Sequence, residues 1–148
     1  MMVSLLLLAL QTAAPPAAPP AAAPAAPPLA AIGPQALPAR GCAAYLWSAA
    51  GDRQLVAMAT AQPAALRLAL DGRPTDLTRT EAGAPAPLGF TADATYRGGD
   101  VTATLAMQVV VRENLTQGAQ VTDGILTVER AGRDTIVLPV AGLVGCRA

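Results

Sequence analysis

The chain has 148 residues, a hydrophobic fraction of 53% and equal numbers of acidic and basic side chains. It has no run of basic residues that could follow a phosphate backbone, so we do not expect a nucleic-acid partner. Histidine is absent and every basic residue is Arg, which excludes Ser-His-Asp triads, Cys-His pairs, Schiff-base lysines and histidine metal sites. We therefore predict no catalytic residue, no metal ligand and no cofactor-binding residue.

The first predicted element is a short apolar run, VSLLLLAL, at residues 3 to 10. A spanning helix needs about 20 apolar residues, whereas the core of a secretory signal has roughly 7 to 15. We interpret residues 1 to 14 as a signal peptide and expect a bacterial protein that is periplasmic or secreted. An uncleaved membrane anchor and a misassigned start codon are the alternatives, and membrane attachment is expected only through this leader.

Residues 15 to 39 consist almost entirely of Ala and Pro and hold most of the chain's 14 prolines. Because proline fixes φ and lacks a backbone donor, the segment is predicted to be a disordered, extended linker. It would serve as a stalk that holds the following domain away from a surface, or it is an unselected product of a GC-rich genome.

Residues 40 to 148 have the length of a single domain, and apolar and polar side chains alternate along much of it. The clearest case is a hairpin from Phe90 to Val111 with a turn at Gly98 and Gly99. A two-residue turn at these glycines fixes the register of the two strands. The predicted pairs are Tyr96 with Val101, Ala92 with Leu105, Phe90 with Met107 and, at the turn, Arg97 with Asp100.

A second hairpin is predicted near the C-terminus, with a three-residue loop that keeps both apolar sets on one face. The predicted pairs are Val128 with Ile136, Leu126 with Leu138, and Arg130 with Asp134. Pro139 falls on the outward phase of the second strand. Its missing donor predicts an edge strand or a bulge there.

Earlier in the domain, strands are predicted at residues 43 to 48, 55 to 60 and 66 to 70, with a return strand through Leu77. Turns are predicted at residues 51 to 52 and 71 to 74, and a loop at residues 82 to 88. Seven or eight short strands of this kind predict an all-β fold. We expect an antiparallel β-sandwich, Ig-like in general layout, with a small β-barrel as the alternative.

The only two cysteines, Cys42 and Cys146, stand just before the first predicted strand and just after the last. They are too few for a zinc site and too far apart for a Cys-X-X-Cys dithiol. We predict a structural disulfide that ties the two ends of the domain together, the alternative being two reduced, buried thiols.

Two aromatic residues, Tyr45 and Trp47, share one face of the first predicted strand. Together they could offer a platform for a sugar ring or a peptide, although a buried Trp47 would be the simpler use of a scarce aromatic side chain. Asp123 and Gly124 are interpreted as a turn before the penultimate strand. The tripeptide from Asn114 to Thr116 is a glycosylation sequon that matters only in a suitable host.

No motif specifies a reaction or a ligand. The leading hypothesis is an exported, non-catalytic module that binds an unknown protein or glycan partner. A carbohydrate-active enzyme with a carboxylate pair is the second hypothesis, and a purely structural envelope protein is the third. The carboxylates from which such a pair could come are Asp52, Asp71, Asp76, Glu81, Asp93, Asp100, Glu113, Asp123, Glu129 and Asp134.

Overall fold

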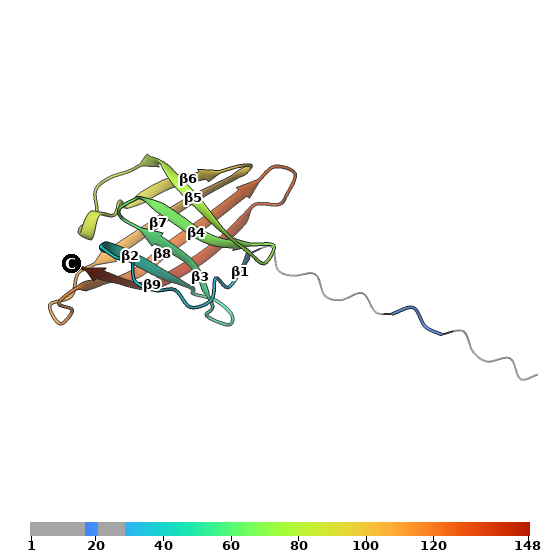
Figure 1. Ribbon diagram of the computed structural model, residues 1–148, viewed down its shortest axis with the longest axis horizontal. Coiled ribbons are helices and arrows are strands. Elements are labelled where there is room, and N and C mark those ends of the chain that lie inside the picture. The colour runs from blue at the N-terminus through green and yellow to red at the C-terminus, as the bar shows by residue number, and fades with distance from the viewer. Residues whose placement is uncertain (1–16, 21–28) are drawn as a thin grey trace, which may run out of the picture.

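The computed structural model describes residues 17 to 20 and 29 to 148 (Figure 1). The leader predicted at residues 1 to 14 lies outside the described residues, as do residues 15, 16 and 21 to 28 of the predicted linker. Among the described residues, no helix has the length and apolar character needed to cross a membrane.

Eight antiparallel strands form a sheet that closes on itself into a barrel. Each strand pairs with the next along the chain, and the last, β9, pairs with the first barrel strand, β2. The barrel strands are β2 (Gly41–Ser48), β3 (Leu55–Thr60), β4 (Ala65–Leu70), β5 (Arg73–Ala82), β6 (Asp93–Gly98), β7 (Val101–Val110), β8 (Gly118–Arg130) and β9 (Ile136–Arg147).

The predicted all-β class is confirmed, and of the two predicted architectures the structure has the barrel rather than the sandwich. A sandwich needs connections that pass from one sheet to another. Here every pair of consecutive barrel strands is hydrogen-bonded, so the chain never leaves the sheet. Period-two alternation cannot distinguish the two folds, because both bury one face of every strand.

The two ends of the barrel differ in what closes them. At one end, here called the hairpin end, lie the turns that join β2 to β3, β4 to β5, β6 to β7 and β8 to β9. At the other, the disulfide end, lie the connections after β3, β5 and β7 together with the C-terminus (Figure 1). All remaining features of the molecule can be placed relative to these two ends.

The barrel interior is filled by aliphatic side chains of mixed size. Leu46, Leu66 and Leu105 are fully buried, and alanines such as Ala44 and Ala103 lie among them. Small and large side chains together fill an eight-stranded barrel, which is just wide enough for a packed core. Ser48 is the one buried polar residue of the described chain.

A disulfide joins Cys42 of β2 to Cys146 of β9, as predicted, with their Cα atoms 4.0 Å apart. The two residues are direct partners across the seam that closes the barrel. Their backbone groups bond away from each other, since the Cys42 carbonyl accepts from Ala61 and the Cys146 amide donates to Gln117. Cα atoms approach most closely in such non-hydrogen-bonded pairs, and both cysteines pack against the core.

The segment from Leu29 to Ala39, assigned above to the linker, lies against the barrel. Its first residues form a short strand, β1 (Leu29–Ala30), which pairs with Leu70 and Ala69 of β4. The β3–β4 ladder ends at Ala57 and Leu68, so β1 occupies the wall where those strands separate. Apolar Leu29 and Ile32 explain why the packed structure begins before residue 40: Ile32 is buried and Leu29 packs against the core.

The hairpin of β6 and β7 forms, but the predicted register was wrong by two residues. The observed pairs place Gly98 opposite Val101, Tyr96 opposite Ala103 and Ala94 opposite Leu105. The turn residues are therefore Gly99 and Asp100, and Gly99 has the positive φ of 59° expected for the first residue of a tight hairpin turn. Arg97 accordingly lies opposite Thr102 and not Asp100.

Packing explains why Gly98 belongs to the strand. A Cβ atom at this position would lie 2.8 Å from Cδ2 of Leu77, which fills that space from β5. The strand β6 is shorter than predicted, because it begins at Asp93 and not at Phe90. Ala92, which was predicted to face inward, is exposed. Because the error is an even number of residues, every side chain from Ala94 onward still faces the predicted side.

The C-terminal hairpin was predicted correctly in its strand pairs, Leu126 with Leu138 and Val128 with Ile136. The third predicted pair, Arg130 with Asp134, and the three-residue loop were wrong, because β8 ends at Arg130 and β9 begins only at Ile136. The Arg130 side chain instead binds Asp71. Pro139 is not on an edge strand. It lies one residue beyond the last β2–β9 pair, where its carbonyl accepts from the amide of Ala49 and a strand amide is not needed.

The turn predicted at Asp123 and Gly124 is absent, because β8 runs without interruption through both residues. The strand contains a bulge instead. Val121 and Gly124 are both buried, while Thr122 and Asp123 between them are both exposed. The change from odd to even buried positions along β8 is the mark of this extra residue.

The predicted strands at residues 43 to 48, 55 to 60 and 66 to 70 are confirmed within β2, β3 and β4. The return through Leu77 is confirmed within β5, which includes Ala82. The loop predicted at residues 82 to 88 is observed at residues 83 to 92 and contains the only described helix, the 3-10 turn η1 (Pro87–Gly89). Asp71 and Gly72 form a two-residue turn with φ of 50° and 77°, as type I′ hairpins require.

Paired cysteine substitutions test the β6–β7 register. Thr95 opposes Thr104 in a pair whose backbone groups face away from each other, which is the geometry that accepts a disulfide. We expect Thr95→Cys with Thr104→Cys to form a second disulfide under oxidising conditions, detected in unreduced peptides by mass spectrometry. The control is Thr95→Cys with Thr102→Cys, which would be opposite each other if Gly98 and Gly99 formed the turn. Efficient crosslinking of this control pair would refute the observed register.

Removal of the native disulfide tests how strongly the closure stabilises the fold. For a loop of this length the chain-entropy model gives a stabilisation of up to ~4.7 kcal/mol. We expect Cys42→Ala with Cys146→Ala to lower the free energy of unfolding by about 2 to 5 kcal/mol in urea titrations. Wild-type protein with dithiothreitol should behave like the variant. Equal midpoints for the oxidised wild type and the variant would show that the bond adds nothing to stability.

Candidate functional site

Tyr45 lies on the outer face of β2, but it is covered. Its hydroxyl donates a 3.0 Å hydrogen bond to the carbonyl of Ala36, in the segment that leads into β2. Leu37 of the same segment lies over the neighbouring Gly145. Burial raises the pKa of the Tyr45 phenol, with the charge of Arg147 acting weakly in the other direction. This side chain fastens the N-terminal segment to the barrel wall.

Trp47 lies on the same outer phase as Tyr45 and is half-buried. It lies beside Ala141 of β9, and the inward position next to it is taken by the fully buried Leu46. Trp47 is therefore neither part of the barrel core nor freely exposed. The predicted platform of two open aromatic rings is reduced to one partly exposed indole at the border of β9.

The outer side of β9 carries a row of apolar residues, here called the β9 outer face. It consists of Val137, Pro139, Ala141 and Leu143, which alternate with the inward residues of the strand. Val137 is 62% exposed and Leu143 50% exposed. On β8, the 41% exposed Ile125 lies opposite Pro139 and extends the face sideways.

Three carboxylates predicted as possible acid or base groups gather at the hairpin end. Asp71, Asp76 and Asp100 line a hollow of about 640 Å³ together with Arg130. Arg130 occupies the last inward position of β8 and donates to Asp71 at 2.7 Å, which links the β4–β5 turn to the end of β8 across the barrel mouth.

The ion pairs at this end oppose acid catalysis by two of these carboxylates. The hydrogen bond from Arg130 lowers the pKa of Asp71, and the two hydrogen bonds from Arg67, at 2.7 and 2.9 Å, lower the pKa of Asp76. A general acid in a glycosidase needs a raised pKa, which burial or a neighbouring carboxylate supplies. Asp71 and Asp76 have the opposite environment.

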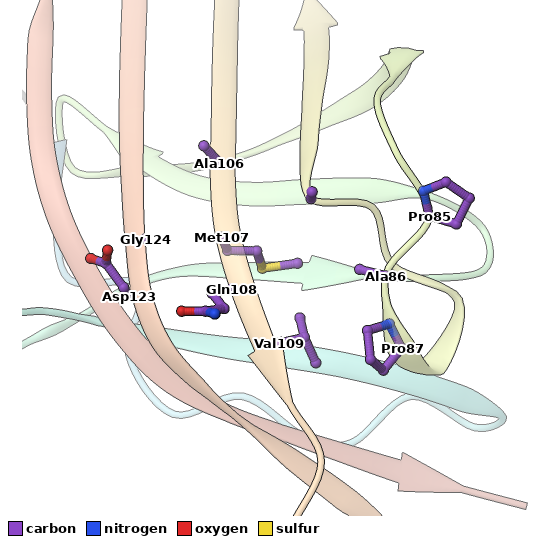
Figure 2. Close-up of a pocket in the computed structure, with 10 residues that line it drawn as sticks. Pro85, Ala86, Pro87, Ala106, Met107, Gln108, Val109, Asp123 and Gly124 are labelled. Atoms are coloured by element: carbon purple, nitrogen blue, oxygen red, sulfur yellow. The ribbon is translucent and has the colours of Figure 1, made fainter.

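A third feature is a groove of about 410 Å³ at the disulfide end, between β7 and the loop that joins β5 to β6 (Figure 2). Figure 2 shows Met107 and Val109 on the side of β7 that faces Ala86 and Pro87 of the loop. Gln108 and Asp123 lie on the other side of β7. The groove is mostly apolar, and Asp123 is the only ionisable residue among those that line it.

Sequence reasoning missed the β9 outer face and the groove, although the sequence contains a signal for each. The outward residues of β9 are apolar at four successive positions, Val137, Pro139, Ala141 and Leu143, where a solvated strand face would carry polar side chains. For the groove, the signal is the change of the apolar positions from odd numbers up to Val121 to even numbers from Leu126, which marks the β8 bulge at Thr122 and Asp123. No group of three or more potential metal-ligating side chains occurs within residues 17 to 20 and 29 to 148.

Comparison with known proteins gives no relative of this chain: no protein-family model, no curated protein and no solved structure matches it.

The Asp71–Arg130 ion pair makes a testable contribution to acid stability. Because Arg130 lowers the pKa of Asp71 in the folded state, the pair stabilises the protein above the ordinary carboxyl pKa of about 4. This contribution is lost as the pH falls through the lowered pKa. We expect the urea midpoint of Asp71→Asn to lie below that of the wild type at pH 6, and the difference to shrink towards pH 2.

Asp52→Asn is the matched control, since Asp52 is an exposed turn carboxylate that forms no ion pair with any described residue. Asn tolerates the positive φ of Asp71, so the substitution tests charge and not backbone strain. A constant difference between Asp71→Asn and the wild type from pH 6 to pH 2 would refute the ion-pair explanation.

Proposed function

We propose that this protein is an exported, non-catalytic β-barrel module that binds a protein partner through the β9 outer face. The observation that carries the proposal is the exposure of Val137 and Leu143, at 62% and 50%, on a strand side with no charged residue between Val137 and Gly145. Contiguous exposed apolar residues on a soluble protein are typical of interaction sites.

The surroundings of this face fit a protein interface. Polar residues border it on β8, where Thr127 lies opposite Val137, so an apolar centre has a polar rim. Trp47 lies beside Ala141 and would add a partly exposed aromatic anchor at the edge. A barrel surface of aliphatic side chains suits another protein better than a sugar, which requires stacked rings and several hydrogen-bond donors.

Export to the periplasm or the exterior is proposed on two grounds. The apolar run at residues 3 to 10 has the length of a signal-peptide core. The Cys42–Cys146 bond is of a kind that persists in oxidising compartments. The Ala/Pro-rich segment between the leader and Leu29 would then act as a spacer between the barrel and any surface to which the chain is attached.

The non-catalytic part of the proposal is supported by the hairpin end. The only described groups in that hollow that could act as acid or base are carboxylates. Arg67 pairs with Asp76 and Arg130 pairs with Asp71, and both ion pairs favour the ionised form of the carboxylate. Arg130 and Asp71 link the end of β8 to the β4–β5 turn, and Arg67 and Asp76 join neighbouring positions of β4 and β5. Glycoside hydrolysis would instead require one of the two carboxyl groups to be protonated near neutral pH.

Aspartate substitutions on the β9 outer face test the proposed interface. In the native cell, full-length tagged protein with a photo-crosslinking residue at Thr127 should capture a partner. Val137→Asp and Leu143→Asp should each reduce capture at least about tenfold, because an unpaired carboxylate would be buried in an apolar contact.

Val111→Asp is the matched control, since Val111 is 54% exposed and follows β7 at the disulfide end. It should leave capture unchanged, and all three variants should keep the thermal midpoint of the wild type within a few degrees. Undiminished capture by both Val137→Asp and Leu143→Asp would refute the β9 outer face as the interface.

A further inference from the structure

We propose that the groove between β7 and the β5–β6 loop binds an extended peptide segment of a partner protein, in which apolar and basic residues alternate. The peptide would add as a strand to β7. This site does not depend on the function proposed for the β9 outer face, although Asp123 in the β8 bulge lies opposite Ala141 of that face.

On the side of β7 that faces the groove, the backbone of Val109 has no strand partner among the described residues. The β6–β7 ladder stops at Asp93 and Ala106, and the last hydrogen bond on that side joins the Met107 amide to the Ala92 carbonyl at 2.8 Å. Backbone groups alternate in direction along an antiparallel strand, so those of Val109 face the same side as those of Met107. They have no backbone partner there among the described residues.

The β5–β6 loop does not complete this edge, because it bonds within itself. The Ala86 amide donates to Phe90 at 2.9 Å, the Ala92 amide donates to Ala84 at 2.8 Å, and Pro85 bridges to Thr91. Pro85 and Pro87 have no amide hydrogen to offer β7. The loop therefore stands beside the edge as a wall, with the groove of about 410 Å³ between them.

An unpaired strand edge selects an extended peptide as the occupant. Such an edge presents both a donor and an acceptor at Val109, and an added strand satisfies both through its own backbone. The residue of the peptide opposite Val109 would exchange two hydrogen bonds with it. A folded surface or a small apolar molecule would leave these groups without partners.

The two sides of β7 select the side chains of the peptide. Successive residues of an added strand point to opposite faces, as those of β7 do. The face with Met107 and Val109, opposite Ala86 and Pro87, accepts an apolar side chain (Figure 2). The face with Gln108 carries the exposed carboxylate of Asp123, raised there by the β8 bulge, so this face favours a long basic side chain.

The bulge explains why the carboxylate is available. In a regular β8, only one of Thr122 and Asp123 would point outward, whereas both are exposed here. The Thr122 hydroxyl donates to the Gln108 side chain at 3.4 Å, whereas Asp123 forms no ion pair within the described residues.

The experiment is an amide NMR titration of the full chain with the acetylated and amidated pentapeptide Ala-Arg-Val-Arg-Ala, whose central Val would lie opposite Val109. We expect saturable shifts confined to Met107, Gln108, Val109, the β8 bulge at Asp123 and the β5–β6 loop. The same peptide with an N-methylated central Val loses one donor and should bind about tenfold more weakly. Ala-Glu-Val-Glu-Ala should bind more weakly than the arginine peptide.

Protein variants separate this site from the β9 outer face. Asp123→Asn should weaken binding of the arginine peptide about two- to fivefold and leave Ala-Ala-Val-Ala-Ala unaffected. Val137→Asp, on the β9 outer face, should bind the arginine peptide like the wild type.

The proposal fails if the arginine peptide causes no shifts at Met107 to Val109 at millimolar concentration, or if the N-methylated peptide binds equally well. It also fails if the free protein already fills the groove. Nuclear Overhauser contacts between Val109 and residues 13 to 28 would assign the groove to the chain's own Ala/Pro-rich segment. Shifts at Met107 to Val109 that depend on protein concentration without peptide would assign it to a second copy.

Discussion

The pairing of β2 with β9 is the contact on which the rest of the structure depends. Without it, the eight strands would form an open sheet with two free edges, and the apolar side chains that now fill the barrel would be partly exposed to water. The ladder runs along the whole of β2, from Gly41 opposite Arg147 to Ser48 opposite Val140, and the Cys42–Cys146 bond locks its far end. These two strands lie at opposite ends of the folded chain, so the contact has the largest loop-closure cost in the barrel. A covalent bond at this position lowers the conformational entropy of the unfolded chain, so less entropy is lost when β2 and β9 pair on folding.

The closed wall also determines where interaction sites can exist. A barrel has no sheet edge except where a strand starts late or ends early. The groove lies at such a place, because β6 begins at Asp93 and leaves the Val109 backbone uncovered. At the hairpin end the comparable gap between β3 and β4 is filled by β1, which bonds to Leu70 and Ala69. One interruption of the wall is thus sealed by the chain itself and the other remains open, while the β9 outer face lies on intact wall between them.

Much of the fold could be predicted from local patterns, since turns and alternation specify hairpins. The Asp71–Gly72 turn and the Leu126–Leu138 pairing were accessible because each depends on a few neighbouring residues. The β6–β7 register was not, because a contact between Gly98 and Leu77 of another strand decides which residues form the turn. The barrel follows from the predicted disulfide if the strands form a meander, since a bond between first and last strands makes them neighbours. The groove depends on where the pairing of β6 with β7 stops, which no period in the sequence records.

The position of the disulfide has a mechanical consequence. Cys42 and Cys146 are separated by 104 positions in sequence and lie on the first and last strands of the barrel. A pulling force applied between the two ends of the chain would first detach β1 and the segment up to Gly41 from the barrel wall. It would then pass from Cys42 to Cys146 directly through the sulfur atoms. The residues between them, which include nearly all of the core and both proposed surfaces, lie outside the path of the load and would keep their shape under tension.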